Sequence, residues 1–202
     1  MHLDAQMQVY TPCGQVANFK TNTKIATSKI PYALNSKLPN SIVIKKAEEV
    51  EERFHSRYNC VGKTYKYIIN NNEFPSALNR YREFHISDKL DIKSMKKALK
   101  FFEGEHDFAG FKSSGGSPKK TTVRNIKKAA LDTTEDNRIV ITLSGDGFLY
   151  NMVRIICGTI VDVGLGKIDV SDIPSIIESK DRKRAGKTLP PHGLYLVEVM
   201  YK

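Results

Sequence analysis

Hydrophobic and polar residues alternate with a period of two in several segments of the chain. The segment Lys63–Ile69 shows this pattern with aromatic and β-branched residues, which predicts a strand with one face toward water. A terminal strand is predicted over Gly193–Tyr201, where one face is expected to carry Tyr195, Val197, Val199 and Tyr201. Other strands are predicted at Gln15–Phe19, Ser41–Lys45, Val123–Leu131 and Arg138–Leu143.

Apolar residues recur three or four positions apart in other segments, which predicts helices. Asp91 is expected to cap a helix that ends at Gly104 and buries one apolar stripe, made of Ile92, Met95, Leu99 and Phe102. Further helices are predicted over Ser28–Lys37, with Ser28 as N-cap and Pro31 in the first turn, over Phe148–Val163, stopped by Gly164, and after Ser171 as N-cap.

The order of these elements predicts an α+β fold. Strands that are close enough in sequence to pair antiparallel alternate irregularly with helices, as expected for helices on one face of a mixed sheet. Residues 112–122 concentrate Ser, Gly, Pro and Lys and are expected to form a basic loop.

The charge of the chain favours a polyanionic partner. The 202 residues include 32 Lys and Arg against 22 Asp and Glu, a formal net charge of +10. Such a surface attracts nucleic acid, although charge alone leaves open a basic protein with no specific anionic partner.

Cysteine and histidine patterns exclude several classes of site. Cys13, Cys60 and Cys157 are odd in number and far apart, so neither a disulfide framework nor a zinc knuckle is predicted. The five histidines lack ligand spacing, and we expect no metal. The most hydrophobic stretch, 148–163, is too short to span a membrane and contains Arg154. A cytoplasmic protein is expected.

Arg154 is the residue whose position most needs an explanation. It lies on an otherwise apolar helical segment, and an unpaired buried guanidinium would cost several kcal/mol, roughly, so a carboxylate or phosphate partner is expected. The alternative is an arginine whose side chain extends along the helix to the surface.

Six sequence motifs, in order along the chain, resemble those of TruA-type tRNA pseudouridine synthases. The motifs are Gly14–Phe19 (GQVANF), Phe54–Tyr58 (FHSRY), Lys63–Tyr67 (KTYKY), Gly104–Phe108 (GEHDF), Phe148–Arg154 (FLYNMVR) and Gly193–Leu196 (GLYL).

The resemblance implies a tRNA-processing isomerase that converts uridine to pseudouridine in the anticodon stem-loop (tRNA positions 38–40), without a cofactor and as a homodimer. It also implies two ferredoxin-like halves that share a mixed, mainly antiparallel sheet. In the family mechanism an aspartate attacks a flipped-out nucleoside, and the uracil detaches, rotates and reattaches through carbon.

The resemblance also implies roles for individual residues. Tyr65 matches the tyrosine that stacks on the uracil, and Arg154 matches the arginine paired with the nucleophile. Phe148 is a further candidate for substrate binding. Without the resemblance, Tyr65 reads as an ordinary strand aromatic and Phe148 as a core residue.

Candidate RNA contacts follow from charge alone. They are Arg57, Lys119, Lys120 and Arg124, with Lys127, Lys128 and the run 180–184 as weaker ones.

The family motif Gly-Arg-Thr-Asp-Ala-Gly-Val-His, which carries the nucleophile, is missing before Gly14. Asp4 is a poor substitute because its neighbours differ. Leu3–Tyr10 can be encoded CTG GAC GCA CAG ATG CAG GTG TAC, followed by ACN for Thr11, and these bases read from the last base of the Leu3 codon give the motif entire. We hypothesise a one-base insertion near Cys13.

This hypothesis predicts three parts of the chain and two possible activities. Residues 1–13 would be an out-of-frame leader, 14–56 a remnant of the N-terminal ferredoxin-like domain, incomplete in its first strands, and 57–202 the C-terminal domain. The chain would be either an active synthase or a catalytically inactive tRNA-binding remnant, and an unrelated basic module fits the motifs less well.

Overall fold

The computed structural model describes residues 11–115 and 121–202, which form two compact units. The larger unit holds the described residues up to Gln15 together with Cys60–Lys202, and the smaller unit is Val16–Asn59. The predicted division at residues 13/14 and 56/57 stays a prediction.

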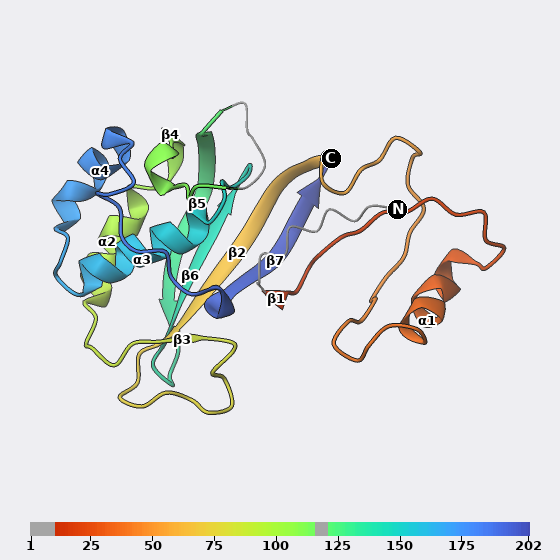
Figure 1. The fold of residues 1–202 in the computed structure, drawn as a ribbon, viewed down its shortest axis with the longest axis horizontal. Helices are drawn as coiled ribbons and strands as arrows, with labels where there is room; N and C mark the ends of the chain where they lie inside the picture. The colour runs from red at the N-terminus through yellow and green to blue at the C-terminus, as the bar shows by residue number, and fades with distance from the viewer. Residues whose placement is uncertain (1–10, 116–120) are drawn as a thin grey trace. The chain divides into compact units, whose positions relative to one another are not determined.

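A mixed, mostly antiparallel sheet forms the larger unit (Figure 1). Its strand order is β1-β7-β2-β6-β5-β4, and β3 also pairs with β2. The β1–β7 and β2–β3 pairs are parallel, and the other pairs are antiparallel. The strands are β1 (Thr11–Pro12), β2 (Cys60–Asn70), β3 (Phe84–His85), β4 (Gly104–Asp107), β5 (Val123–Thr133), β6 (Arg138–Gly145) and β7 (Leu194–Tyr201).

The period-two pattern accounts for the central strand β2. Tyr65, Tyr67 and Ile69 are buried on one face, whereas Lys66 is exposed on the other and Thr64 donates to the Ser144 hydroxyl at 3.0 Å. The predicted strand is therefore confirmed. The strands predicted at 123–131 and 138–143 are confirmed as β5 and β6.

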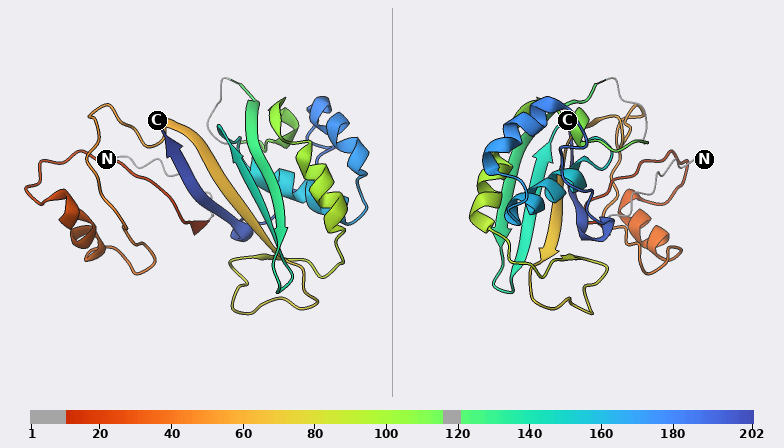
Figure 2. Two further views of the ribbon diagram at one scale, coloured as in Figure 1. Left: turned by 180° about the vertical axis from the view of Figure 1, so that it is seen from behind. Right: turned by 60° about the vertical axis from the view of Figure 1, so that its left-hand side comes forward.

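Three α-helices, α2 (Ile92–Lys100), α3 (Met152–Gly164) and α4 (Ile173–Ser179), cover one face of the sheet (Figures 1 and 2). Short 3-10 helices are η2 (Ala109–Phe111), η3 (Val170–Asp172) and η4 (Pro191–Gly193). The α+β class predicted from the order of elements is confirmed.

Helix α2 begins as its sequence predicts. The Asp91 carboxylate accepts hydrogen bonds from the backbone N–H groups of Lys93 and Ser94, at 2.9 and 3.1 Å. Met95 and Leu99 are fully buried. The Ser94 hydroxyl also donates to this carboxylate, at 2.6 Å. This hydrogen bond first, and then those from the backbone, hold the pKa of the Asp91 carboxyl below its ordinary value, because they stabilise the ionised form.

Two helix starts were predicted wrongly. Helix α3 begins at Met152 and not at Phe148, because Asn151 has a left-handed backbone (φ 61°) that a helix cannot continue through. Ser171 is not the cap of the next helix. The Asp169 carboxylate accepts from the Ser171 N–H at 2.8 Å and begins η3, which leads into α4.

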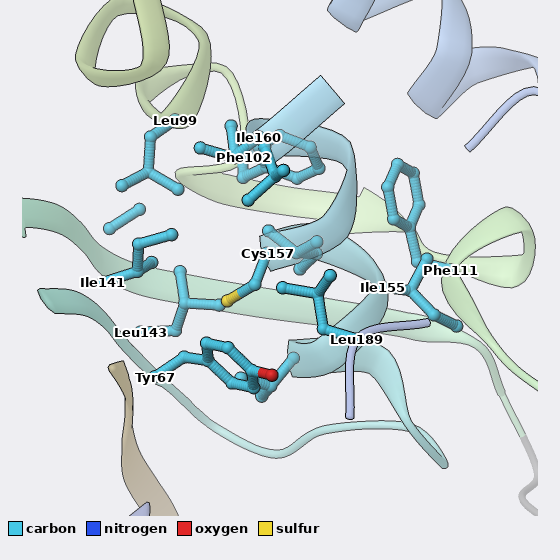
Figure 3. Close-up of a cluster of buried hydrophobic side chains, with 14 of the residues drawn as sticks. Tyr67, Leu99, Phe102, Phe111, Ile141, Leu143, Ile155, Cys157, Ile160 and Leu189 are labelled. Atoms are coloured by element: carbon cyan, nitrogen blue, oxygen red, sulfur yellow. The ribbon is translucent and has the colours of Figure 1, made fainter. Parts of the chain in front are cut away.

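Helix α3 is the central element of the core and is covered by the segment 186–190. A Cβ atom on Gly158 would lie 1.8 Å from the Lys187 carbonyl oxygen, so the segment can lie this close only because Gly158 has no side chain. The Gly186 N–H donates to the Thr159 hydroxyl at 2.9 Å. Figure 3 shows Leu189 packed beside Tyr67 as a result.

Strand β7 contains a bulge that changes its pattern. Tyr65 pairs with Leu196 and Thr64 with Glu198, so Val197 is an extra residue in β7. Leu196 faces the core before the bulge, and Val199 packs against it afterwards. The prediction that Tyr195, Val197, Val199 and Tyr201 share one face is therefore wrong.

The smaller unit contains η1 (Thr27–Lys29) and α1 (Ile30–Asn35). The predicted helix is confirmed in part, but Ser28 lies inside η1 and does not cap α1, which has no side-chain cap. The Asn35 amide makes two hydrogen bonds with the backbone of Ile44, at 2.7 and 2.9 Å.

The two strands predicted near the N-terminus are wrong. Residues 15–19 and 41–45 have no strand structure, and their apolar side chains stay in water, with Phe19 51% and Val43 65% exposed. Alternation alone does not make a strand, because a strand needs a partner for its backbone hydrogen bonds.

A buried polar cluster joins one end of β2 to β6. Glu83 is 5% exposed and accepts hydrogen bonds from Arg138 Nε at 2.6 Å and from the Asn70 amide at 2.8 Å. Each charged or polar group therefore has the partner that its burial requires.

Glu83→Ala should lower the free energy of unfolding by about 2–3 kcal/mol, because it leaves Arg138 Nε and the Asn70 amide nitrogen without this acceptor, although Arg138 keeps its ion pair with Asp136. Chemical denaturation with circular dichroism measures the change. Glu73→Ala, at an exposed site, is the control and should change stability by less than about 0.5 kcal/mol. Equal effects of the two substitutions would contradict the role of the cluster.

Gly158→Ala should lower the free energy of unfolding by about 3 kcal/mol, because the added methyl group forces the segment 186–190 away from α3. Gly147→Ala is the control, since its Cβ would have its nearest neighbour at an ordinary 3.7 Å. If the two variants melt at the same temperature, the close approach at Gly158 is not important for stability.

Candidate functional site

Arg154 lies in the first turn of α3 and is held by two neutral oxygen atoms. Its Nε donates to the Leu189 carbonyl oxygen at 2.6 Å, and its Nη1 donates to the Asn151 side-chain oxygen at 2.8 Å. The side chain is half-buried, so it neither lies in an apolar core nor extends fully into water. The close approach of 186–190 to α3 places the first of these acceptors.

The predicted carboxylate partner is not found within residues 11–115 and 121–202. No ion pair joins Arg154 to an acidic side chain in this part of the chain. Of the two acidic residues closest to it in sequence, Asp146 accepts from the Asn125 N–H at 3.1 Å, and Asp162 lies beside Gly186. Asp4 lies outside the described residues.

The surroundings of Arg154 shift two pKa values. Burial lowers the pKa of the guanidinium, and the nearby hydroxyl groups of Tyr67 and Tyr150 oppose this effect. Burial, and then the Cys157 thiol, raise the pKa of Tyr67 well above its ordinary range, while the Arg154 cation acts against them. Tyr67 therefore stays protonated and donates to the Pro190 carbonyl oxygen at 2.6 Å.

Tyr65 and Phe148, the predicted substrate-binding aromatics, contact each other. Their ring centroids are 5.3 Å apart and their planes are nearly perpendicular, at 86°, an edge-to-face contact. Tyr65 is 8% exposed, and Phe148 packs partly buried against the core. The strand β2 and the turn before α3 thus bring two residues 83 positions apart into one pair.

Asn151 is a site residue that the sequence analysis missed. Its side-chain nitrogen donates to the Ser113 hydroxyl at 3.1 Å, while its oxygen accepts from Arg154. The Ser113 N–H donates to the Tyr150 carbonyl oxygen at 3.2 Å. An asparagine just before a helix is a usable signal, because asparagine tolerates the left-handed backbone found here.

The structure describes two of the four main predicted RNA contacts, Arg57 and Arg124. Arg57 is exposed in the smaller unit, with its guanidinium 5.8 Å from the Tyr58 ring centroid. Lys119 and Lys120 lie outside the described residues. Arg124 on β5 donates to the Thr121 carbonyl oxygen at 3.0 Å. Their contacts with phosphate therefore stay predictions, as do those of the exposed Lys127 and Lys128.

Three cations of the run 180–184 have protein partners. Lys180 pairs with Asp107 at 2.8 Å. Arg182 donates to the Gly186 carbonyl oxygen at 2.9 Å, and Arg184 donates to the Ser175 hydroxyl at 3.0 Å. Arg182 thereby helps to hold the segment that covers α3, which is a structural role.

The chemistry of metals and thiols adds little to the site. Within the described residues no group of three or more His, Cys, Asp or Glu side chains could hold a metal ion. Cys13, Cys60 and Cys157 are free thiols. None of the described helices has the length and apolar character needed to cross a membrane.

Comparison with known proteins places this site in a family. A family model described as tRNA pseudouridine synthase matches residues 98–202, which include Phe148 and Arg154. A tRNA pseudouridine synthase A of Acetivibrio thermocellus is 55% identical over 188 residues, covering 93% of this chain and 76% of the relative.

Two further relatives agree. The tRNA pseudouridine synthase A of Ruminiclostridium cellulolyticum is 50% identical over 188 residues, again 93% of this chain and 76% of the relative. The tRNA pseudouridine synthase A 2 of Clostridium perfringens is 52% identical over 186 residues, 92% of this chain and 75% of the relative. With its mixed sheet, its one-sided helices and this degree of identity, the chain belongs to the TruA-type tRNA pseudouridine synthase family.

Proposed function

We propose that this chain binds the anticodon stem-loop of tRNA, at the uridines of tRNA positions 38–40, but does not turn them over. The family supports tRNA as the ligand and isomerisation as the lineage's reaction. The formal net charge of +10 supports a polyanionic partner, since basic side chains gain free energy by releasing the counterions of the nucleic acid.

One observation carries the proposed loss of turnover. Within the described residues the Arg154 guanidinium is bonded to neutral oxygens of Leu189 and Asn151, and no carboxylate pairs with it. The proposed reaction needs a nucleophile, and a carboxylate beside an arginine is kept ionised because the cation lowers its pKa. Residues 4–13 differ from the family motif that supplies this carboxylate.

The active synthase is the second candidate, and the aromatic pair favours it. Tyr65 and Phe148 are held in edge-to-face contact, so the surroundings of a flipped uracil would be preserved. In this alternative Tyr65 stacks on the base and Phe148 supports Tyr65. Arg154 orients the nucleophile, and Asp4 would have to be that nucleophile.

The remaining features of the proposal concern partners and location. We propose that no cofactor takes part, because the isomerisation exchanges one glycosidic bond for another without a change in oxidation state. A homodimer in the cytoplasm is proposed by family resemblance. Residues 14–56 are proposed as the remnant of the N-terminal ferredoxin-like domain.

The purified chain should bind unmodified tRNA but release no tritium from tRNA labelled at C5 of uridine. Filter binding should weaken at least about tenfold between 50 and 200 mM salt, because phosphate contacts dominate the affinity. Tritium release at the rate of the Acetivibrio thermocellus relative, assayed in parallel, would contradict the inactive form. Absence of salt-sensitive binding would contradict the RNA-binding function itself.

The gene should contain the codons CAG for Gln6, CAG for Gln8 and GTG for Val9. The shifted motif requires these choices, because the third bases of these three codons become the first bases of its Asp, Gly and Val codons. Each of those codons begins with guanine. Nucleotide sequencing from Leu3 to Gly14 measures this directly. An adenine in the third position of any of the three codons would eliminate the frameshift hypothesis.

A further inference from the structure

The side chain of Asn151 is bonded on both sides. Its oxygen lies 2.8 Å from Arg154 Nη1, and its nitrogen lies 3.1 Å from the Ser113 hydroxyl. A guanidinium can only donate, so the atom facing Arg154 must be the amide oxygen, and the amide nitrogen must face Ser113. The orientation of the amide is therefore fixed by chemistry.

The backbone of Asn151 has a conformation that asparagine tolerates better than most residues. Its φ of 61° is left-handed, which is unfavourable for most residues with a Cβ atom and is best tolerated by asparagine and aspartate. This conformation ends the preceding turn and starts α3 at Met152. This uncommon conformation thus occurs at the residue whose amide contacts both Ser113 and Arg154.

The partner of the Asn151 amide nitrogen is Ser113, in the segment Lys112–Gly115. The segment Lys112–Gly115 is held against the residues before α3 by the Ser113 N–H, which donates to the Tyr150 carbonyl oxygen at 3.2 Å. The Tyr150 ring lies 3.8 Å from the position that a Cβ atom on Gly115 would take. The Asn151 amide adds a hydrogen bond between side chains, to the Ser113 hydroxyl, to these contacts.

On its other side Asn151 restricts Arg154. Leu189 O and Asn151 Oδ1 together hold Nε and Nη1, which fixes the plane of the guanidinium. Within the described residues Nη2 has no hydrogen-bond acceptor, so this end of the group is available to an oxyanion.

We propose that Asn151 is a positioning residue that ties the guanidinium of Arg154 to the segment Lys112–Gly115. An anion bound at Arg154 then restrains the segment Lys112–Gly115 through the Asn151 amide. The second statement rests on the proposed RNA-binding function, whereas the tie between Ser113, Asn151 and Arg154 does not.

The test measures how fast phenylglyoxal modifies Arg154 in the folded protein. The modification is quantified by mass spectrometry, with the exposed Arg57 as internal reference. Asn151→Gly keeps the left-handed backbone and removes both hydrogen bonds, so Arg154 should react about tenfold faster. Asn151→Asp keeps the acceptor and can accept from the Ser113 hydroxyl, so it should restore slow modification.

Ser113→Ala tests whether Arg154 is positioned through Asn151, because Ser113 is hydrogen-bonded to Asn151 and not to Arg154. It should speed the modification of Arg154 about threefold, by freeing the Asn151 amide. Melting temperatures of all variants serve as the fold control. Unchanged Arg154 reactivity in Asn151→Gly or in Ser113→Ala would overturn the proposal.

A second arm uses an unmodified tRNA transcript as the probe. Asn151→Gly should weaken its binding about tenfold relative to the parent chain, and Asn151→Asp should weaken it too, because the added negative charge repels phosphate. If the transcript does not bind the parent chain, the proposed function fails, and the phenylglyoxal rates still decide the positioning role. If the transcript binds Asn151→Gly as tightly as the parent, the link to RNA is wrong.

Discussion

The close approach of the segment 186–190 to helix α3 is the constraint on which the site depends. A helix normally keeps a neighbouring backbone at a distance set by its side chains, and here Gly158 and Gly186 remove that barrier. Two carbonyl oxygens then reach otherwise buried donors, Leu189 O to Arg154 and Pro190 O to Tyr67. Without this contact the buried Tyr67 hydroxyl would lose its acceptor, and Arg154 would keep only Asn151 of its two described acceptors.

This arrangement explains how an arginine is tolerated in an apolar helix. A fully buried ion pair must offset the loss of two hydration shells, which costs several kcal/mol per ion, roughly, whereas a half-exposed guanidinium with carbonyl acceptors loses much less. The irregular backbone before β7 supplies the acceptors because its carbonyl groups are not used in a sheet. Irregular structure is therefore what permits the charge.

The sequence predicted those elements whose local pattern and tertiary partners agree. Strand β2 has clear alternation and strands on both sides, and α2 has both a cap at Asp91 and an apolar stripe. Residues 15–19 and 41–45 have the alternation without partners, and they form no strands. The start of α3 was missed because the apolar pattern continues back to Phe148, and the signal for the left-handed backbone, the asparagine at position 151, was not used.

The site was predicted in its residue types but not in its contacts. The resemblance singled out Tyr65 and Arg154, and the structure places Tyr65 against Phe148 and Arg154 against Leu189. A backbone acceptor 35 residues away leaves no sequence signature, because any residue carries a carbonyl group. The expectation of a charged partner for Arg154 therefore could not have been refined from residue identities.

The bulge in β7 sets the parity of the last residues. Val197 has no partner residue in β2. The alternation of side chains between the two faces of the sheet is therefore shifted by one residue after it. Val199 consequently packs against the core, whereas the acidic Glu198 beside it is exposed. One extra residue in β7 thus determines whether an apolar or a charged side chain faces the core at the end of this strand.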